Sequence, residues 1–402
     1  MTENRSSDLD VLVSGAGIAG PAVAFWLHRH GARVTVVEKA DGVRAGGQAV
    51  DVKGDVHRTV LERMGILDEL RAHQTGGVDQ AIVDATGRRL AVLPAAFSAG
   101  ELEIRRGDLA AILHRRTRDT CEYVFGDAVT SLTETAGGVH VTFERGAPRT
   151  FDLVVGADGI HSGIRRLAFG PEERFVRHLG YHYALVELPA GNPFADVPAV
   201  VYNEPGRMAA VGGPDSPAFF VFASDPLHYD RYAVDEQRRI VLDAFAGGGW
   251  RLPELLEQVR SAPDVHVDSI SRVEMDRYAA GRVVLVGDAG YGNTLGGFGT
   301  GLALVAGYVL AGELALAGGD HRRAFRAYEQ RFRPYAAVAR KGHAGSFLAP
   351  ASRRGIRARN LVLRARPLLS ALLWVTDRFA TNIELPDYAA LLAARRNPAS
   401  TT

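Results

Sequence analysis

Residues 11–38 read VLVSGAGIAGPAVAFWLHRHGARVTVVE, and this stretch decides the expected fold. The apolar run Val11–Ser14 predicts a strand, three glycines follow, and an apolar helical pattern continues to His30. Gly31 is typical of a helix end, and Arg33–Val37 predicts a second strand. This order is the first half of a βαβ unit, so we expect an α/β fold with a parallel sheet.

The glycines of this stretch have the spacing Gly-x-Gly-x-x-Gly between a strand and a helix, which predicts a dinucleotide-binding loop. The first permits a tight turn, the second lets a pyrophosphate approach the backbone, and the third lets helix pack on strand. Free N–H groups at the helix start bind the phosphates. The residues of this expected site are Gly15, Gly17, Ile18, Ala19 and Gly20.

Glu38 stands eighteen residues after Gly20, where a carboxylate can accept hydrogen bonds from a ribose diol. The alternative interpretation is a glycine-rich turn with Glu38 as a surface charge. Composition alone does not decide between NAD and FAD.

Two further apolar strands end on a glycine and an aspartate. Residues 153–159 read LVVGADG, and residues 284–290 read VLVGDAG, followed by LGGFGTG at 295–301 and an apolar helix. Such strand ends present a carboxylate and bare backbone to a ligand at the edge of a sheet.

With these three motifs in this order, the sequence resembles the class A flavin-dependent monooxygenases, the family of p-hydroxybenzoate hydroxylase and of the tetracycline-modifying and polyketide hydroxylases. The resemblance extends over nearly the whole chain. It implies an α/β architecture: a Rossmann-like FAD-binding domain, an inserted β-sheet substrate domain and a helical C-terminal segment.

The resemblance also implies roles for individual residues. The first glycine loop binds the FAD pyrophosphate, Glu38 the adenosine ribose with Lys39 beside it, and Arg106 the ribityl–phosphate region. Asp158 belongs to a motif linked to FAD and NADPH, and Asp288 to one that contacts FAD. The residues expected along or near the flavin ring are Gly47, Asp51, Gly296, Gly297, Gly299 and Thr300.

One segment departs from the family pattern. After the second Gly-Asp the family usually has Ala-His and a proline-containing loop, whereas this chain has Tyr291, no proline and one residue fewer. The path of this loop, and the mobility of the flavin ring, are left open by the sequence.

The mechanism implied by the resemblance uses tightly but non-covalently bound FAD. NADPH or NADH reduces the flavin, O₂ adds to give a C4a-hydroperoxide, and one oxygen atom passes to an aromatic or polyketide-like substrate. No second glycine fingerprint is present, which favours a reductant that docks transiently. The alternatives are a flavoprotein that oxidises or rearranges its substrate without net hydroxylation, and a non-catalytic FAD-containing ligand-binding protein.

The rest of the chain suggests a division into domains. We expect the FAD-binding domain at 1–76, 100–173 and 270–340, the β-rich substrate domain at 77–99 and 174–269, and C-terminal helices at 341–402. The apolar stretch Leu302–Leu316 is short for a membrane span and predicts a buried helix.

Alternating aromatic residues in the β-rich part suggest a wall for a planar substrate. The candidates are Tyr181, Tyr183, Tyr202, Phe220 and Phe222. A packed core face explains the same alternation. His182 or His178 could accept a phenolic proton, but an ordinary polar role explains either residue, so we name no general base.

Composition limits the remaining function classes. One cysteine, Cys121, excludes dithiol chemistry and a cysteine-rich zinc site, and we expect no metal. The net charge of +1 gives no global reason to expect nucleic acid as a partner. The polar N-terminus lacks a signal-peptide pattern, so we expect a cytoplasmic monomer or homodimer without stable membrane insertion.

The segment Arg322–Arg366 is locally basic, with 12 arginines and Lys341 against Glu329 alone. A nucleic-acid or membrane-surface role is conceivable. Solvated arginines on helices, or pairing with the acidic remainder, explain the segment as well.

Overall fold

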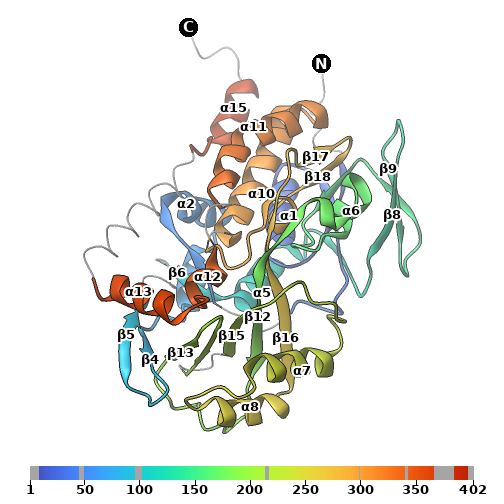
Figure 1. The fold of residues 1–402 in the computed structure, drawn as a ribbon. Coiled ribbons are helices and arrows are strands. Elements are labelled where there is room, and N and C mark those ends of the chain that lie inside the picture. Colours follow the sequence, from blue (N-terminus) through green and yellow to red (C-terminus); the bar gives the residue numbers. More distant parts are fainter. Residues whose placement is uncertain are drawn as a thin grey trace.

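The fold contains a six-stranded sheet, seen in Figure 1 beside helices α1 (Ala19–Arg29) and α10 (Gly299–Leu316). The computed structural model describes residues 9–44, 49–95, 102–212, 217–297, 299–339, 343–365 and 384–396. The strand order of the sheet is β17-β18-β11-β1-β2-β7, with parallel pairing throughout except between β17 and β18. These strands are β1 (Asp10–Ser14), β2 (Arg33–Glu38), β7 (Glu122–Phe125), β11 (Leu153–Gly156), β17 (Ala279–Ala280) and β18 (Val283–Leu285). The expected βαβ start is therefore present.

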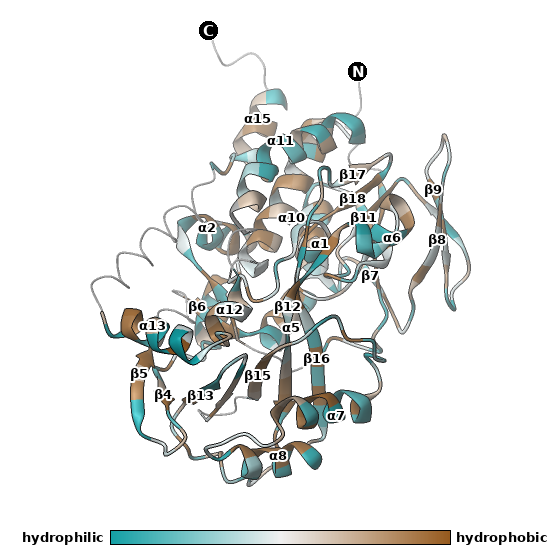
Figure 2. Cartoon of the chain, viewed as in Figure 1, coloured by the Kyte–Doolittle hydropathy of each residue, from teal (hydrophilic) through white to brown (hydrophobic). Residues whose placement is uncertain are grey.

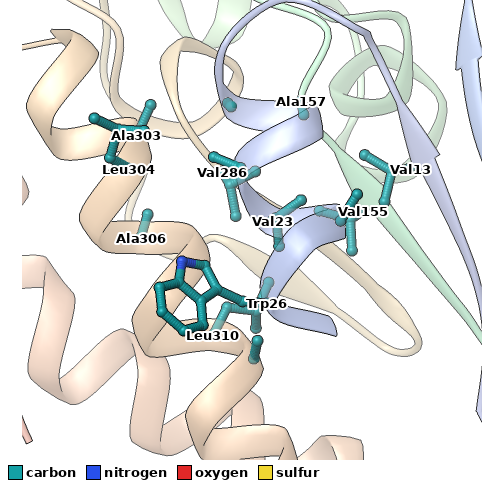
Figure 3. Packing of buried hydrophobic residues seen from close by; sticks show 14 of the residues in the cluster. Val13, Val23, Trp26, Val155, Ala157, Val286, Ala303, Leu304, Ala306 and Leu310 are labelled. Atoms are coloured by element: carbon teal, nitrogen blue, oxygen red, sulfur yellow. The ribbon is translucent and has the colours of Figure 1, made fainter. Parts of the chain in front are cut away.

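The core lies between this sheet and two long helices. Helix α1 (Ala19–Arg29) follows β1, and α10 (Gly299–Leu316) lies beside it. Figure 3 shows Val13 and Val155 of the sheet, Val23 and Trp26 of α1, and Leu310 of α10 in one apolar cluster. A Cβ built on Gly307 would lie 3.0 Å from the Val23 Cα, so this glycine permits the close approach of the two helices.

Helix α10 is long and apolar enough to cross a membrane, but 83% of it is buried inside the protein. Every residue from Gly301 to Ala315 is buried, as expected for a core helix, and much of α10 is brown or pale in Figure 2. The predicted buried helix is confirmed.

A second, seven-stranded sheet has the order β16-β12-β15-β14-β13-β4-β5. Its strands are β4 (Gln80–Val83), β5 (Arg89–Leu93), β12 (Val176–Glu187), β13 (Val200–Glu204), β14 (Arg207–Val211), β15 (Ala218–Ala223) and β16 (Asp264–Val273). Helices α7 (Val234–Phe245) and α8 (Leu252–Arg260) cover one face, as Figure 1 shows. The other face holds a separate apolar cluster, to which α12 (Ala344–Leu348) and α13 (Arg353–Arg364) contribute.

Smaller elements complete the architecture. A two-stranded sheet joins β3 (Ala49–Val52) to β6 (Leu102–Arg105), and a three-stranded sheet contains β8 (Val129–Glu134), β9 (Val139–Phe143) and β10 (Arg149–Phe151). The remaining helical segments are α2 (Gly54–Met64), α3 (Leu67–Ala72), α5 (Arg106–Thr117), α6 (Gly163–Phe169), η2 (Glu172–Arg174), α9 (Asp288–Tyr291), α11 (His321–Ala339) and α15 (Tyr388–Arg396).

The α/β fold class is confirmed, and two local expectations need correction. The pattern of residues 55–73 predicts one helix, but Gly65 adopts a left-handed conformation and divides this segment into α2 and α3. Strand β16 was not recognised, and it continues past residue 269, where the β-rich part was expected to end. The division into domains stays a prediction.

Candidate functional site

Three loops meet at the carboxyl ends of β1, β11 and β18. Gly15 has φ +107°, and a Cβ there would lie 2.5 Å from the carbonyl oxygen of Ala157. Gly287 has φ +63°, and its Cβ would lie 2.9 Å from the Cβ of Ala19. Only glycine fits these two contacts, so the three motifs found in the sequence form one continuous backbone surface.

The N-terminus of α1 is suited to an anion. No side chain caps this helix end, and its first turn contains no acidic residue. The first N–H groups of a helix have no acceptor within the helix. Among the described residues, a Cβ at Gly17 would meet only the Arg106 Nη2 atom, at 3.8 Å, so these residues leave the space beside this backbone open. A diphosphate fits here, with Ile18 and Ala19 at the helix start.

Arg106 begins α5 on the opposite side of the Gly17 space. Its side chain is exposed and has no hydrogen bond or ion pair with any residue in the described ranges. The guanidinium group is close enough to lower the pKa of Asp288. A free guanidinium between a helix N-terminus and a carboxylate is suited to a phosphate or a polar cofactor chain.

Glu38 lies against the glycine loop, and its expected role at a ribose stays a prediction. Its carboxylate accepts hydrogen bonds from the backbone N–H of Ala16 at 2.8 Å and of Ala40 at 2.9 Å. Lys39 points elsewhere: its ammonium lies over the ring of Tyr232, 4.7 Å from the centroid. The expected role of Lys39 beside a ribose stays a prediction.

Asp288 lies beside the N-terminus of α10. Solvent reaches the Asp288 side chain, but protein atoms surround it closely. The loss of water around the carboxylate raises its pKa, and the nearby charge of Arg106 offsets part of this rise. Both properties fit a carboxylate facing a space enclosed by protein. A Cβ on Gly299 would lie 3.3 Å from the Asp288 Oδ1 atom, so Asp288 and Gly299 are neighbours, and Thr300 follows in the first turn of α10. The expected contacts of these residues with FAD stay predictions.

Tyr291 gives the unusual loop after Asp288 a structural anchor. Its hydroxyl accepts a hydrogen bond from the Gly287 N–H at 2.6 Å, and the side chain is buried against Tyr278 and Phe332. Burial raises the pKa of Tyr291, so the hydroxyl stays protonated. Tyr291 therefore holds the turn that carries Asp288.

We expect Tyr291→Phe to lower the free energy of unfolding by about 1–3 kcal/mol, because the buried Gly287 N–H loses its acceptor. Urea unfolding followed by circular dichroism measures this change. The control is Tyr232→Phe, since Tyr232 is 64% exposed and its ring can still contact Lys39. Equal stability of the two variants would contradict the anchoring role.

The second motif contributes a buried arginine. Asp158 accepts hydrogen bonds from the Ser162 hydroxyl and from the Ile164 N–H at 3.0 Å, so its carboxylate stabilises its own turn. Arg165 is fully buried and donates to the carbonyl oxygens of Ala289 at 2.9 Å and Ile160 at 2.6 Å. Arg165 thus joins the β11 loop to the β18 loop. The expected contact of Asp158 with a dinucleotide stays a prediction.

His161 connects the same loop to the seven-stranded sheet. Its ring nitrogens contact Glu172 at 2.8 Å and Asp268 of β16 at 3.0 Å. Burial opposes protonation, but hydrogen bonds to these two carboxylates raise the pKa of His161 above its ordinary value. Burial likewise opposes ionisation of Glu172 and Asp268, yet His161 lowers the pKa of both. Sequence analysis missed this ion-pair cluster.

The stability contributed by this cluster depends on pH. Glu172 and Asp268 contribute fully to the free energy of unfolding when the pH is above their ordinary pKa values, the higher of which is 4.5, for Glu172. This contribution is lost as the pH falls through the lowered pKa values of the two acids. The His161 contribution is complete below 6.5 and is lost as pH rises through its raised pKa. We therefore expect His161→Gln to destabilise the protein most between pH 4.5 and 6.5.

The size of this effect should be on the order of 1–3 kcal/mol, as for other hydrogen bonds to charged groups. Urea unfolding of wild type and variant across the pH range measures it. His140→Gln is the control, because His140 is exposed on β9. A stability difference that grows towards alkaline pH would contradict the assignment.

Three candidates near the expected flavin ring have different surroundings. Asp51 on β3 forms an ion pair with Lys53, with 3.6 Å between Oδ2 and Nζ. Gly297 has φ +77° and open space around its Cβ position, whereas a Cβ on Gly296 would lie 2.9 Å from Asn293. Gly47 lies outside the described residues. Their roles stay predictions.

The five aromatic candidates do not form one wall, which corrects the sequence interpretation. Tyr181 and Tyr183 belong to the apolar cluster on the face with α12 and α13. The other three pack on the opposite face with α7 and α8, and they are Tyr202, Phe220 and Phe222. In the β12–β15 register Phe220 pairs with Ala184 and Phe222 with His182, so these phenylalanines share the face of the even-numbered β12 residues.

His178 and His182, the two histidines considered as proton acceptors, form hydrogen bonds with Ser224, which follows β15. His178 contacts the Ser224 carbonyl oxygen at 2.9 Å, and His182 contacts the Ser224 hydroxyl at 2.7 Å. Burial lowers the pKa of His182 to about 4. Both have an ordinary polar role. Within the described ranges, no group of three or more metal-ligating side chains could hold a metal ion.

Part of the basic segment has structural contacts. Arg359 donates to the carbonyl oxygens of Phe347 and Leu348 and to the Asn203 side chain. Arg331 pairs with the buried Glu313 at 3.1 Å. These arginines fasten helices to the fold. Cys121 is buried, as expected for a small core residue.

Comparisons with known proteins agree with this geometry. A family profile described as "FAD binding domain" matches residues 8–341. A flavin-dependent monooxygenase of Legionella longbeachae is 35% identical over 341 residues, which cover 82% of this chain and 86% of the relative. The FAD-dependent monooxygenase asL4 of Sarocladium schorii is 30% identical, over 96% of this chain and 99% of the relative.

Solved structures show the same architecture. The crystal structure of tetracycline destructase Tet(55) has a TM-score of 0.80 and 32% sequence identity, and the match covers 95% of this chain and 99% of the other. The residues matched by the family profile include all three loops of the site.

Proposed function

The chain belongs to the FAD-binding-domain family of class A flavin-dependent monooxygenases, and on that premise we propose that it uses NADPH or NADH and O₂ to hydroxylate an aromatic or polyketide-like small molecule. The reaction balances as substrate, O₂, NAD(P)H and a proton giving hydroxylated substrate, NAD(P)⁺ and water. A cytoplasmic location and a monomeric or homodimeric state stay predictions.

The observation that carries the proposal is the free Arg106 guanidinium opposite the open backbone of Gly17. The residues fit FAD: the N-terminus of α1 for the diphosphate, Glu38 for the adenosine ribose, and Arg106, Asp288 and the start of α10 for the remainder. Bound FAD supplies the electron transfer and oxygen activation that side chains lack.

The protein's own residues orient and enclose the reactants. Arg165 and Tyr291 hold the loops that carry Asp158 and Asp288. His161 ties the loop after β11 to β16, so the seven-stranded sheet is fixed against these loops. A sheet held in this position can exclude water from the reacting centre.

The substrate class is supported by the relatives and by one sheet face. The similar structure is named a tetracycline destructase, and tetracycline is a polycyclic polyketide. Tyr183 lies near the expected cofactor, since the charges of Arg106 and Asp288 act on its pKa, which burial raises most strongly. A planar ring system suits an aromatic wall of this kind.

The test is NADPH and NADH oxidation by the FAD-loaded protein in air, with tetracycline and a panel of polyphenols as probes. We expect a probe to stimulate oxidation and to gain an oxygen atom. Stimulated O₂ use with an unoxygenated product would instead support oxidation without hydroxylation. Tight binding without stimulation would support a non-catalytic binding protein.

A further inference from the structure

One face of the seven-stranded sheet places a histidine beside Tyr183. In the β12–β16 register, Tyr183 pairs with Asp268 and Leu185 with His266. Leu185 also pairs with Phe219 of β15. Directly paired residues share a face, so these five side chains lie on the same side of the sheet. The Tyr183 ring centroid is 6.2 Å from that of His266 and 6.3 Å from that of Phe219.

This face is turned towards the loops of the candidate site. Asp268 is bound by His161 from the loop after β11. Arg44 and Arg106 are close enough to His266 for their charges to lower its pKa, and Arg106 is the residue that reaches Gly17. His266 therefore lies beside Tyr183 on this face, within electrostatic range of Arg44 and Arg106.

His266 has free hydrogen-bonding capacity. The residue is half-buried, and its ring nitrogens have no hydrogen-bond partner within the described part of the chain. His161 and the Ser269 N–H already occupy Asp268 Oδ1. A half-buried polar ring without a partner can bind a ligand at low cost, because no protein hydrogen bond must be broken.

The charged neighbours favour a neutral imidazole. Burial lowers the pKa of His266 most, Arg44 and Arg106 lower it further, and Asp268 and Asp264 raise it. The nearby Tyr183 hydroxyl is neutral, since burial raises its pKa. Near neutral pH, His266 therefore offers one nitrogen as an acceptor, while the two arginines favour negative charge nearby.

We propose that His266 receives the acidic hydroxyl of the substrate, a phenol or enol on a planar ring that lies against Tyr183, Leu185 and Phe219. The hydroxyl proton moves to a ring nitrogen of His266, the O–H bond electrons stay on the oxygen, and Arg44 stabilises the oxyanion. An ionised hydroxyl donates electron density to its ring, which aids attack on an electrophilic oxygen. This assignment rests on the proposed function.

A matched pair of probes tests the assignment: 2,6-dihydroxyanthraquinone, whose acidic hydroxyls have no internal hydrogen-bond acceptor, and 2,6-dimethoxyanthraquinone, which has no hydroxyl. Binding to the FAD-loaded protein is followed by the change in flavin absorbance. We expect wild type to bind the dihydroxy probe more tightly than the dimethoxy probe. In His266→Leu the ratio of the two affinities should fall about tenfold, the equivalent of one hydrogen bond. Affinity for the dimethoxy probe should be unchanged.

The pH profile provides a second readout. The phenolate absorption of the bound dihydroxy probe should appear at lower pH in wild type than in His266→Leu. His266→Gln, which can accept a hydrogen bond but cannot take the proton, should restore part of the affinity without restoring the ionisation. His140→Leu, at an exposed position on β9, is the control.

The outcomes separate the two levels of the proposal. Equal losses for both probes, or an unchanged preference in His266→Leu, would overturn the role of His266 and leave the monooxygenase assignment standing. Failure of wild type to bind either probe would overturn the substrate class, and the role of His266 with it.

Discussion

Gly17→Val should fold normally and lose FAD. Within the described part of the chain, a Cβ at this position meets only the end of the Arg106 side chain, so the fold accepts valine, but the branched group occupies the space expected for the diphosphate. We expect at least about 100-fold weaker FAD binding, equivalent to about 2.7 kcal/mol in binding free energy. The rate of NADPH oxidation at limiting FAD should fall in proportion. Fluorescence titration of the apoprotein with FAD measures the affinity.

Stability separates this effect from misfolding. Urea unfolding of apo Gly17→Val should stay within about 0.5 kcal/mol of wild type, as for most changes in open positions. Gly137→Ala is the matched control, because nothing lies within 4 Å of its Cβ position. Wild-type FAD affinity in Gly17→Val would place the diphosphate elsewhere.

Arg165→Met should cause the largest loss of stability. The substitution leaves the carbonyl oxygens of Ala289 and Ile160 without their donor and removes a positive charge near Glu172, at 3.5 Å. Removing one partner from a buried ionic group costs about 3–5 kcal/mol. FAD retention should fall as well, since Arg165 joins two of the three loops.

The neighbouring residue provides the control. Arg166→Met changes an exposed arginine of the same helix and should alter the free energy of unfolding by less than about 0.5 kcal/mol. Urea unfolding of both apoproteins decides the matter. Similar stabilities would mean that Arg165 does not hold the loops together.

The arrangement of the three glycine loops was predictable because its determinants are local. Gly15, Gly17 and Gly20 lie between the end of β1 and the first turn of α1, and they permit the close backbone contacts of this loop. The same holds for the turns at Asp158 and Asp288. Each motif combines a strand, a glycine and an acid within a few residues, so spacing carries the information.

The faces of the seven-stranded sheet were not predictable in the same way. Alternation shows which residues of a strand share a face, but the register between strands decides which strands contribute to that face. Phe220 therefore joined Tyr183 in the sequence interpretation, although it pairs with Ala184 and lies opposite. The contact of His161 with Asp268 spans 107 residues and depends on the same register.

The sequence of strand β16 contains a pattern that predicts a strand with one apolar face. In strand β16, Val265 and Val267 alternate with His266 and Asp268, which is the pattern of a strand with one apolar face. That pattern would have identified the strand and its polar face. Only the structure shows that this face lies beside the cofactor loops.

The most direct test of the central claim is the origin of the oxygen atom in the product. The FAD-loaded protein is incubated with NADPH and tetracycline, or with the polyphenol that most stimulates oxidation, under oxygen-18 gas in ordinary water. The mass of the product is then measured by mass spectrometry. If the protein is a monooxygenase, we expect one labelled oxygen atom per product molecule under oxygen-18 gas, and no label when only the water carries oxygen-18. A product that carries oxygen from water, or no added oxygen, would contradict the account.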